Sequence, residues 1–107
     1  MALAAPDATW WVSGQKEMCP FVGTFPFAER EEQLKGMFKE AVSFKMTIRG
    51  ITTEGDTVVL EGAPRGERKD GGIYVNDVML KFVIKDGKIQ SLKEYADLLS
   101  ILKFMAP

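Results

Sequence analysis

The chain has 107 residues, with 14 Lys and Arg against 15 Asp and Glu and a net charge of −1, which favours one globular domain and leaves no basic excess for binding nucleic acid. Its single cysteine excludes an internal disulfide and suits a reducing cytoplasm, and the absence of histidine removes the usual zinc sites and the commonest general base. No apolar run approaches the roughly 20 residues of a membrane span and no signal peptide is visible, so we expect a cytoplasmic protein with no membrane partner.

The first quarter of the chain predicts a short strand followed by an irregular apolar segment. Residues 1–6 are expected to be a loose start, and Thr9–Val12 is rich in strand formers. Trp10 and Trp11 are neighbours on that strand, so only one of them can face the core. Residues 19–27 contain two prolines and a glycine, and we expect them to fold their phenylalanines inward without regular structure.

A helix is predicted over residues 28–42. Glu29 and its acidic neighbours lie in the first turn, where negative charge suits the helix dipole. One apolar stripe follows the i, i+3, i+4, i+7 spacing and would face the core. Its members are Leu34, Met37, Phe38 and Ala41.

Strands and hairpins are predicted for the rest of the chain. Alternating patterns cover residues 44–53 and 57–63, and residues 64–72 are expected to form a solvated loop. Asp86-Gly87 is a strong hairpin signal between a strand that begins at Tyr74 and a last strand over residues 88–96, because both central residues of a type I′ turn need a positive φ. We expect a short apolar tail of one or two helical turns to close the chain.

Alternation on the Tyr74 strand separates two faces. One face is a wall of apolar residues with two polar groups at one end: Tyr74, Asn76, Val78, Leu80, Phe82 and Ile84. The other face is half apolar, which is typical of a dimer or helix contact: Val75, Asp77, Met79, Lys81 and Val83. Glu94 lies among apolar residues on the last strand, and it is the place where the sequence hints at chemistry.

These elements predict an α+β fold. A strongly curved antiparallel or mixed sheet would form a cone around one long helix, and such a cone has an interior. We expect a single domain over residues 1–107 and a homodimer through the outer sheet face.

The chain resembles the nuclear-transport-factor-two-like superfamily in its SnoaL-like branch. The motifs that carry the resemblance are D-A-T-W-W-V-S-G, F-V-G-T-F, E-G-D-T-V and Y-V-N-D-V-M-L-K-F-V-I-K-D-G-K-I-Q-S-L-K-E-Y-A-D. One fold in this superfamily hosts isomerases, dehydratases, epoxide hydrolases, cyclases and non-catalytic carriers. The resemblance implies that Glu94 points into the cone as an acid or base, and that Tyr74 and Asn76 lie at its mouth.

The chain departs from the superfamily pattern in two respects. Members usually begin with one or two helices that lid the cone, and only six residues precede Asp7 here. Three explanations are open: the domain is naturally lidless, its start is trimmed, or a partner chain supplies the cover. The epoxide hydrolases also use an Asp-Arg-Asp relay, which has no convincing match, so that reaction is disfavoured.

Three functions remain open at this point. The first is a cofactor-free isomerase, cyclase or dehydratase of small apolar carbonyl compounds, with Glu94 moving a proton and Tyr74 and Asn76 holding the oxygen. The second is a ligand-binding module without chemistry, and the third is an association domain whose open cone docks another chain. For the ligand we expect contacts from Trp10, Phe38 and Val78.

Each candidate residue also has a structural interpretation. Glu94 could pair with Lys93 or Lys81 or remain hydrated, and Tyr74 and Asn76 could satisfy the sheet rim. The tryptophans could pack the sheet or a dimer seam, and Phe38 and Val78 could be core residues. Cys19 is expected to be a small buried hydrophobe, and Asp97 to cap the last helical turns. The aspartates lie at turns without calcium-loop spacing, so we expect no metal.

Overall fold

A computed structural model describes residues 3–105. Its elements in chain order are β1 (Ala4–Val12), β2 (Gly23–Pro26), α1 (Phe27–Met37), β3 (Ala41–Glu54), β4 (Thr57–Arg68), β5 (Ile73–Val75), β6 (Val78–Lys85), β7 (Lys88–Ala96) and α2 (Leu98–Met105). These elements confirm the predicted α+β class.

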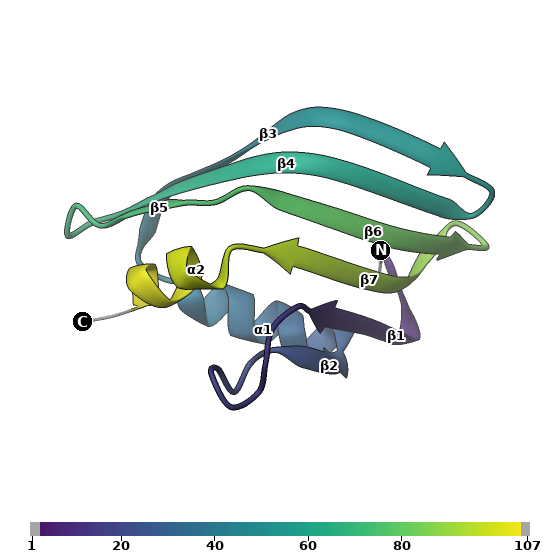
Figure 1. Ribbon diagram of the computed structural model, residues 1–107, viewed down its shortest axis with the longest axis horizontal. Coiled ribbons are helices and arrows are strands. Elements are labelled where there is room, and N and C mark those ends of the chain that lie inside the picture. Colours follow the sequence, from purple (N-terminus) through teal and green to yellow (C-terminus); the bar gives the residue numbers. More distant parts are fainter. Residues whose placement is uncertain (1–2, 106–107) are drawn as a thin grey trace.

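The strands form one large mixed sheet that is not closed. Its order is β2-β1-β7-β6-β4-β3, with β5 paired to β4, and β2 and β3 are the outer strands of this order. All of its pairs are antiparallel except β1 with β7. Figure 1 shows α1 lying beside β1 and β2 on one side of the sheet, while α2 follows the end of β7. We call the sheet face that looks toward α1 the inner face and the opposite one the outer face.

The hairpin between β6 and β7 forms at the predicted turn, but the strand expected to begin at Tyr74 is divided. Residues Ile73–Val75 form β5, which pairs with β4, and β6 begins at Val78. Asp86 has a φ of 53° and Gly87 a φ of 75°, as a type I′ turn requires at both central positions. Lys85 pairs with Lys88 directly beside the turn. The turn fixes the register, and this register places Leu80 opposite Glu94 on the inner face.

The N-terminal part is more regular than expected. β1 begins at Ala4, so residues 4–6 of the expected loose start belong to a strand, while residues 1 and 2 lie outside the described residues. Part of the segment expected to be irregular, Gly23–Pro26, pairs with β1 as a short strand. Its proline can be accommodated because β2 is an outer strand.

The helix is shorter than predicted. α1 ends at Met37 and Phe38 is its C-cap, whereas Ala41 and Val42 begin β3. Ala41 pairs with Arg68 at the far end of β4. Sheet pairing therefore overrides a helical pattern that continued in the sequence.

The loop predicted for residues 64–72 is mostly strand. β4 runs through Pro64 to Arg68, and only residues 69–72 turn the chain. Pro64 lies where β4 changes its neighbour from β6, which pairs up to Gly62, to β5, which pairs from Arg65. The missing N–H of proline is tolerated at this break in the ladder.

The two neighbouring tryptophans separate as predicted. Trp10 is buried in an inner-face core cluster with Val12, Cys19 and Val22. Trp11 packs edge-on against Tyr95 with 5.1 Å between ring centroids. Cys19 is only 1% exposed, in agreement with its prediction as a buried hydrophobe. Among residues 3–105, neither helix is long and apolar enough to cross a membrane.

Candidate functional site

A cavity of about 570 Å³ lies between the inner face of the sheet and α1. Alternation along β6 and β7 brings Val78, Leu80, Phe82 and Leu92 to this face, and their side chains line the cavity. The predicted contacts Trp10, Phe38 and Val78 lie in the lining together with Tyr74 and Glu94. The remaining lining residues are Val12, Phe21, Phe27, Arg30, Gln33, Leu34, Met37, Phe44, Met46, Pro64, Ile101 and Met105.

Glu94 is the carboxylate of this cavity. Trp10 donates a hydrogen bond from Nε1 to Glu94 Oε1 over 3.0 Å. Burial raises the pKa of Glu94, and the Trp10 hydrogen bond and the Arg30 charge oppose that rise. Among residues 3–105 no lysine lies within ion-pair distance of Glu94. The raised pKa brings the carboxyl closer to the range in which it can take up and release a proton near neutral pH.

Tyr74 is another residue of the same lining. Its oxygen accepts a hydrogen bond from Asn76 Nδ2 over 2.9 Å. Burial is the main cause that raises the pKa of Tyr74, to about 12, with the charge of Glu94 as a smaller contribution. The phenol therefore remains protonated at neutral pH. Because the Asn76 amide occupies an acceptor position, the O–H proton is left to donate to another group.

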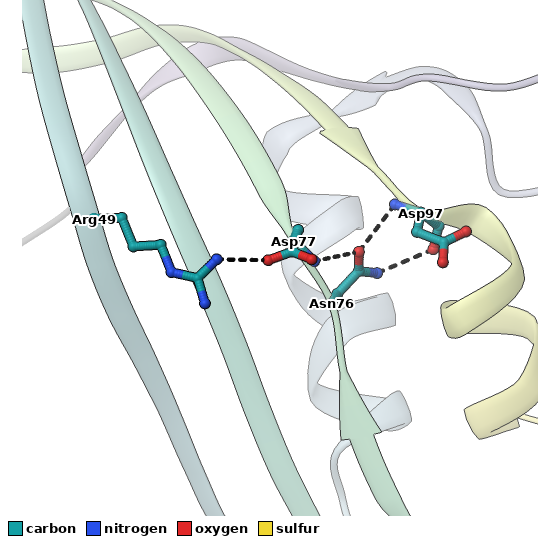
Figure 2. Close-up of polar contacts among 4 residues, drawn as sticks. All are labelled: Arg49, Asn76, Asp77 and Asp97. Atoms are coloured by element: carbon teal, nitrogen blue, oxygen red, sulfur yellow. Dashed lines mark hydrogen bonds and ion pairs between the residues drawn. The ribbon is translucent and has the colours of Figure 1, made fainter.

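Asn76 has a structural position rather than a place in the cavity lining. Figure 2 shows its side chain between Asp77 and Asp97, the residue that precedes α2. Oδ1 accepts from the backbone N–H groups of Asp77 and Asp97 over 2.8 Å and 2.9 Å, while Nδ2 donates to the Asp97 carbonyl over 3.0 Å and to Tyr74. These four bonds use the whole capacity of the amide. The expectation that Asn76 holds a substrate oxygen is thus not supported by its surroundings.

Asp97 caps α2 as predicted. Its carboxylate accepts hydrogen bonds from the backbone N–H of Leu99 over 3.1 Å and from Ser100 Oγ over 2.6 Å. The Ser100 hydrogen bond is the largest of the causes that lower the pKa of Asp97. The cap fixes the start of α2, and α2 in turn supplies Ile101 and Met105 to the cavity lining.

Arg30 is a charged residue of the lining that the sequence did not single out. It is only 5% exposed, although it lies in the acidic first turns of α1. Its spacing to Leu34 and Met37 is i, i+4, i+7, the same spacing that defined the apolar stripe. That stripe could have revealed it, because a charged residue in line with an inward-facing stripe is a candidate for the interior.

The site offers no evident metal ligands. Among residues 3–105, no group of three His, Cys, Asp or Glu side chains is placed to hold a metal ion. The chemistry available to the described lining comes from one carboxylate, one guanidinium, one phenol, one indole N–H and one amide, in walls that are otherwise apolar. Such a set can bind an apolar molecule and exchange a proton with it.

Comparison with known proteins confirms the family expectation. A model of the SnoaL-like domain family matches residues 1–92. The match includes Trp10, Tyr74 and Val78, and it ends two residues before Glu94. The role expected for Glu94 therefore rests on its own surroundings.

Individual relatives agree with this assignment. UPF0523 protein C from Dictyostelium discoideum is 29% identical over 98 residues, which cover 89% of this chain and 63% of that protein. An NTF2-like protein from Burkholderia pseudomallei has a TM-score of 0.77 at 13% identity, covering 98% of this chain and 81% of that one. An LEH-like epoxide hydrolase from M. tuberculosis has a TM-score of 0.69 at 18% identity, covering 96% and 71%. These two structures support the cone fold.

Proposed function

This chain belongs to the SnoaL-like domain family, and we propose that its cavity binds a small apolar carbonyl compound on which Glu94 moves a proton. The observation that carries the proposal is a carboxylate, the one such group in the described lining, in a mostly apolar cavity of about 570 Å³, where it accepts the Trp10 N–H. Burial raises the pKa of that carboxyl, as a group that both takes and returns a proton requires. The reaction class is isomerisation, cyclisation or dehydration without a cofactor.

The proposed step moves a proton and no other atom. The Glu94 carboxylate takes a proton from a carbon next to the carbonyl group, so that the C–H bond breaks and an O–H bond forms on Glu94. The electron pair moves to the carbonyl oxygen, where the Tyr74 O–H donates a hydrogen bond. Returning the proton to a different carbon completes an isomerisation. Asn76 acts indirectly by holding the Tyr74 oxygen.

A ligand-binding module without chemistry is the second candidate. The same apolar lining would bind the same class of molecule, and Glu94 would then only orient it. The two candidates agree on binding and differ on proton transfer. An assay that follows a carbon-bound proton therefore separates them.

The test is the exchange of the α-protons of 2-tetralone, a bicyclic ketone, for deuterium in D₂O. We expect the protein to accelerate this exchange above the buffer rate, with saturation as the ketone concentration rises, when the ketone signals are followed by NMR. A variant in which Leu80→Trp fills the cavity should remove the acceleration. Saturable binding without faster exchange would favour the binding module. The absence of both binding and faster exchange would contradict the cavity function itself.

We further propose that the chain forms a homodimer through the outer face. Met79 is 44% exposed and Tyr95 47% exposed, and they pair directly across β6 and β7. Trp11 packs on Tyr95 and extends this apolar surface to β1. Equilibrium sedimentation at micromolar concentration should give the mass of two chains, and Met79→Glu should return it to one. A monomer in the unmodified protein would contradict the proposal.

A further inference from the structure

Arg30 is a buried cation held by uncharged partners. Nη1 donates to the Phe21 carbonyl and to Gln33 Oε1, the latter over 3.0 Å, and Nη2 donates to the Gly23 carbonyl over 3.0 Å. The guanidinium carbon lies 4.2 Å from the centre of the Phe25 ring. None of these contacts supplies a negative charge. The charge is held rigidly, but it is not neutralised at contact distance by these partners.

The hydrogen-bonding capacity of Arg30 is not used up. A guanidinium has five N–H donors, and three of them are engaged in the bonds above, which leaves two. One of the two is Nε–H, which is buried and has no partner among the described residues. A buried donor without a partner is costly and usually has a reason. Here the side chain lies in the wall of the ligand cavity.

The charges around Arg30 identify its counterpart. Burial lowers the pKa of Arg30, and the strongest opposing influence is the charge of Glu94, with a smaller one from Glu29 of its own helix. Glu94 is also the carboxylate that lines the same cavity. When Glu94 accepts a proton it loses its negative charge, and that charge passes to the bound molecule. A ligand anion in the cavity would then replace Glu94 as the counter-charge of Arg30.

We propose that Arg30 stabilises the oxygen-centred anion formed when Glu94 takes a proton, so that the substrate is an acidic carbonyl compound such as an enolisable ketone or a conjugated enol. This inference rests on the proposed function and adds a charged group that stabilises the negative charge together with the Tyr74 O–H. A fixed cation aimed at the place where charge develops is an effective form of catalytic stabilisation. The ligand oxygen lies toward the guanidinium, and the carbon or oxygen that loses the proton lies toward Glu94.

The test uses a probe whose ionisation is visible. The phenol of 7-hydroxy-4-methylcoumarin is conjugated to a carbonyl group, and its neutral and anionic forms absorb at different wavelengths near neutral pH. An apolar cavity alone would raise the pKa of the bound probe, and so would the like charge of Glu94. If Arg30 holds the anion, the pKa of the probe should fall on binding. In the Glu94→Gln variant, which lacks the opposing carboxylate, this fall should be roughly one unit or more. Absorbance titration of the bound probe measures this shift.

Variants at Arg30 assign the shift to the guanidinium. Arg30→Met should raise the pKa of the bound probe above its value in water, whereas Arg30→Lys keeps the charge and should keep part of the fall. If either variant fails to fold, the sign of the shift in the Glu94→Gln protein still decides. A raised pKa of the probe bound to the Glu94→Gln protein would overturn the role of Arg30. The proposed function would remain intact if the unmodified protein still accelerates the exchange of 2-tetralone. If neither this probe nor its neutral 7-methoxy analogue binds, the cavity function and the inference both fail.

Discussion

Replacing Glu94 with glutamine is expected to slow the protein-catalysed exchange of 2-tetralone by about 10²–10⁴-fold, the usual contribution of a positioned acid–base group. Glutamine keeps the size of the side chain and an oxygen that can accept the Trp10 hydrogen bond, but it cannot take up the substrate proton. The binding of 7-methoxy-4-methylcoumarin, which is neutral, should be retained. The comparison therefore isolates proton transfer from ligand binding.

A matched control is available on the outer side of the sheet. Glu61 is an exposed carboxylate on β4 opposite Met79. Glu61→Gln removes the same charge and should leave the exchange rate unchanged. Full exchange activity in the Glu94→Gln protein would remove Glu94 from the mechanism and leave a ligand-binding module.

The pH dependence of both activity and stability follows from the raised pKa of Glu94. Exchange requires the carboxylate, so the rate should rise with pH through a value above that of an ordinary glutamic acid. Between the unfolded and the folded pKa, the folded state binds more protons than the unfolded state. The contribution of Glu94 to stability therefore falls as pH rises through that interval. Glu94→Gln should remove this loss, so its melting temperature at neutral pH should be no lower than that of the unmodified protein.

The predictable part of the fold is the part determined by local patterns. Asp86-Gly87 can occupy positive φ values, and the alternation beside it fixed both the β6–β7 hairpin and its inner face. The end of α1 was not predictable in this way. The apolar spacing continued to Ala41, but that residue gains a strand partner in Arg68, which is distant in sequence. The run from Pro64 to Arg68 was misread as loop for the same reason.

The candidate site also contains residues that local patterns predict and residues that only tertiary contacts explain. Glu94, Tyr74, Trp10 and Val78 reach the cavity because strand alternation and β-sheet register place them on its inner face. Asn76 has the same alternation, yet its amide is used by the backbone where β5 gives way to β6. Such a role depends on tertiary contacts that no spacing reveals. Arg30 was missed because its neighbours in sequence are acidic and exposed.

The largest effect on stability is expected from Phe104→Ala in α2. Phe104 is only 4% exposed, and its ring lies 5.4 Å from that of Tyr74 and 5.6 Å from that of Phe38. Arg68 stacks over the ring at 4.4 Å and donates a hydrogen bond to the Phe104 carbonyl over 2.7 Å. Removing a buried phenylalanine ring costs about 3–5 kcal/mol. This is a large share of the 5–15 kcal/mol typical of a whole domain.

Thermal denaturation should show the loss as a fall in melting temperature of roughly 10 °C or more. Leu99→Ala in the same helix is the matched control, because Leu99 is 73% exposed and its truncation should change stability by less than about 0.5 kcal/mol. Equal melting temperatures for the two variants would mean that α2 is not docked on β5 in solution. The cavity would then lack the wall that Ile101 and Met105 provide. If ligand binding needs that wall, the affinity for 7-methoxy-4-methylcoumarin should fall together with the melting temperature.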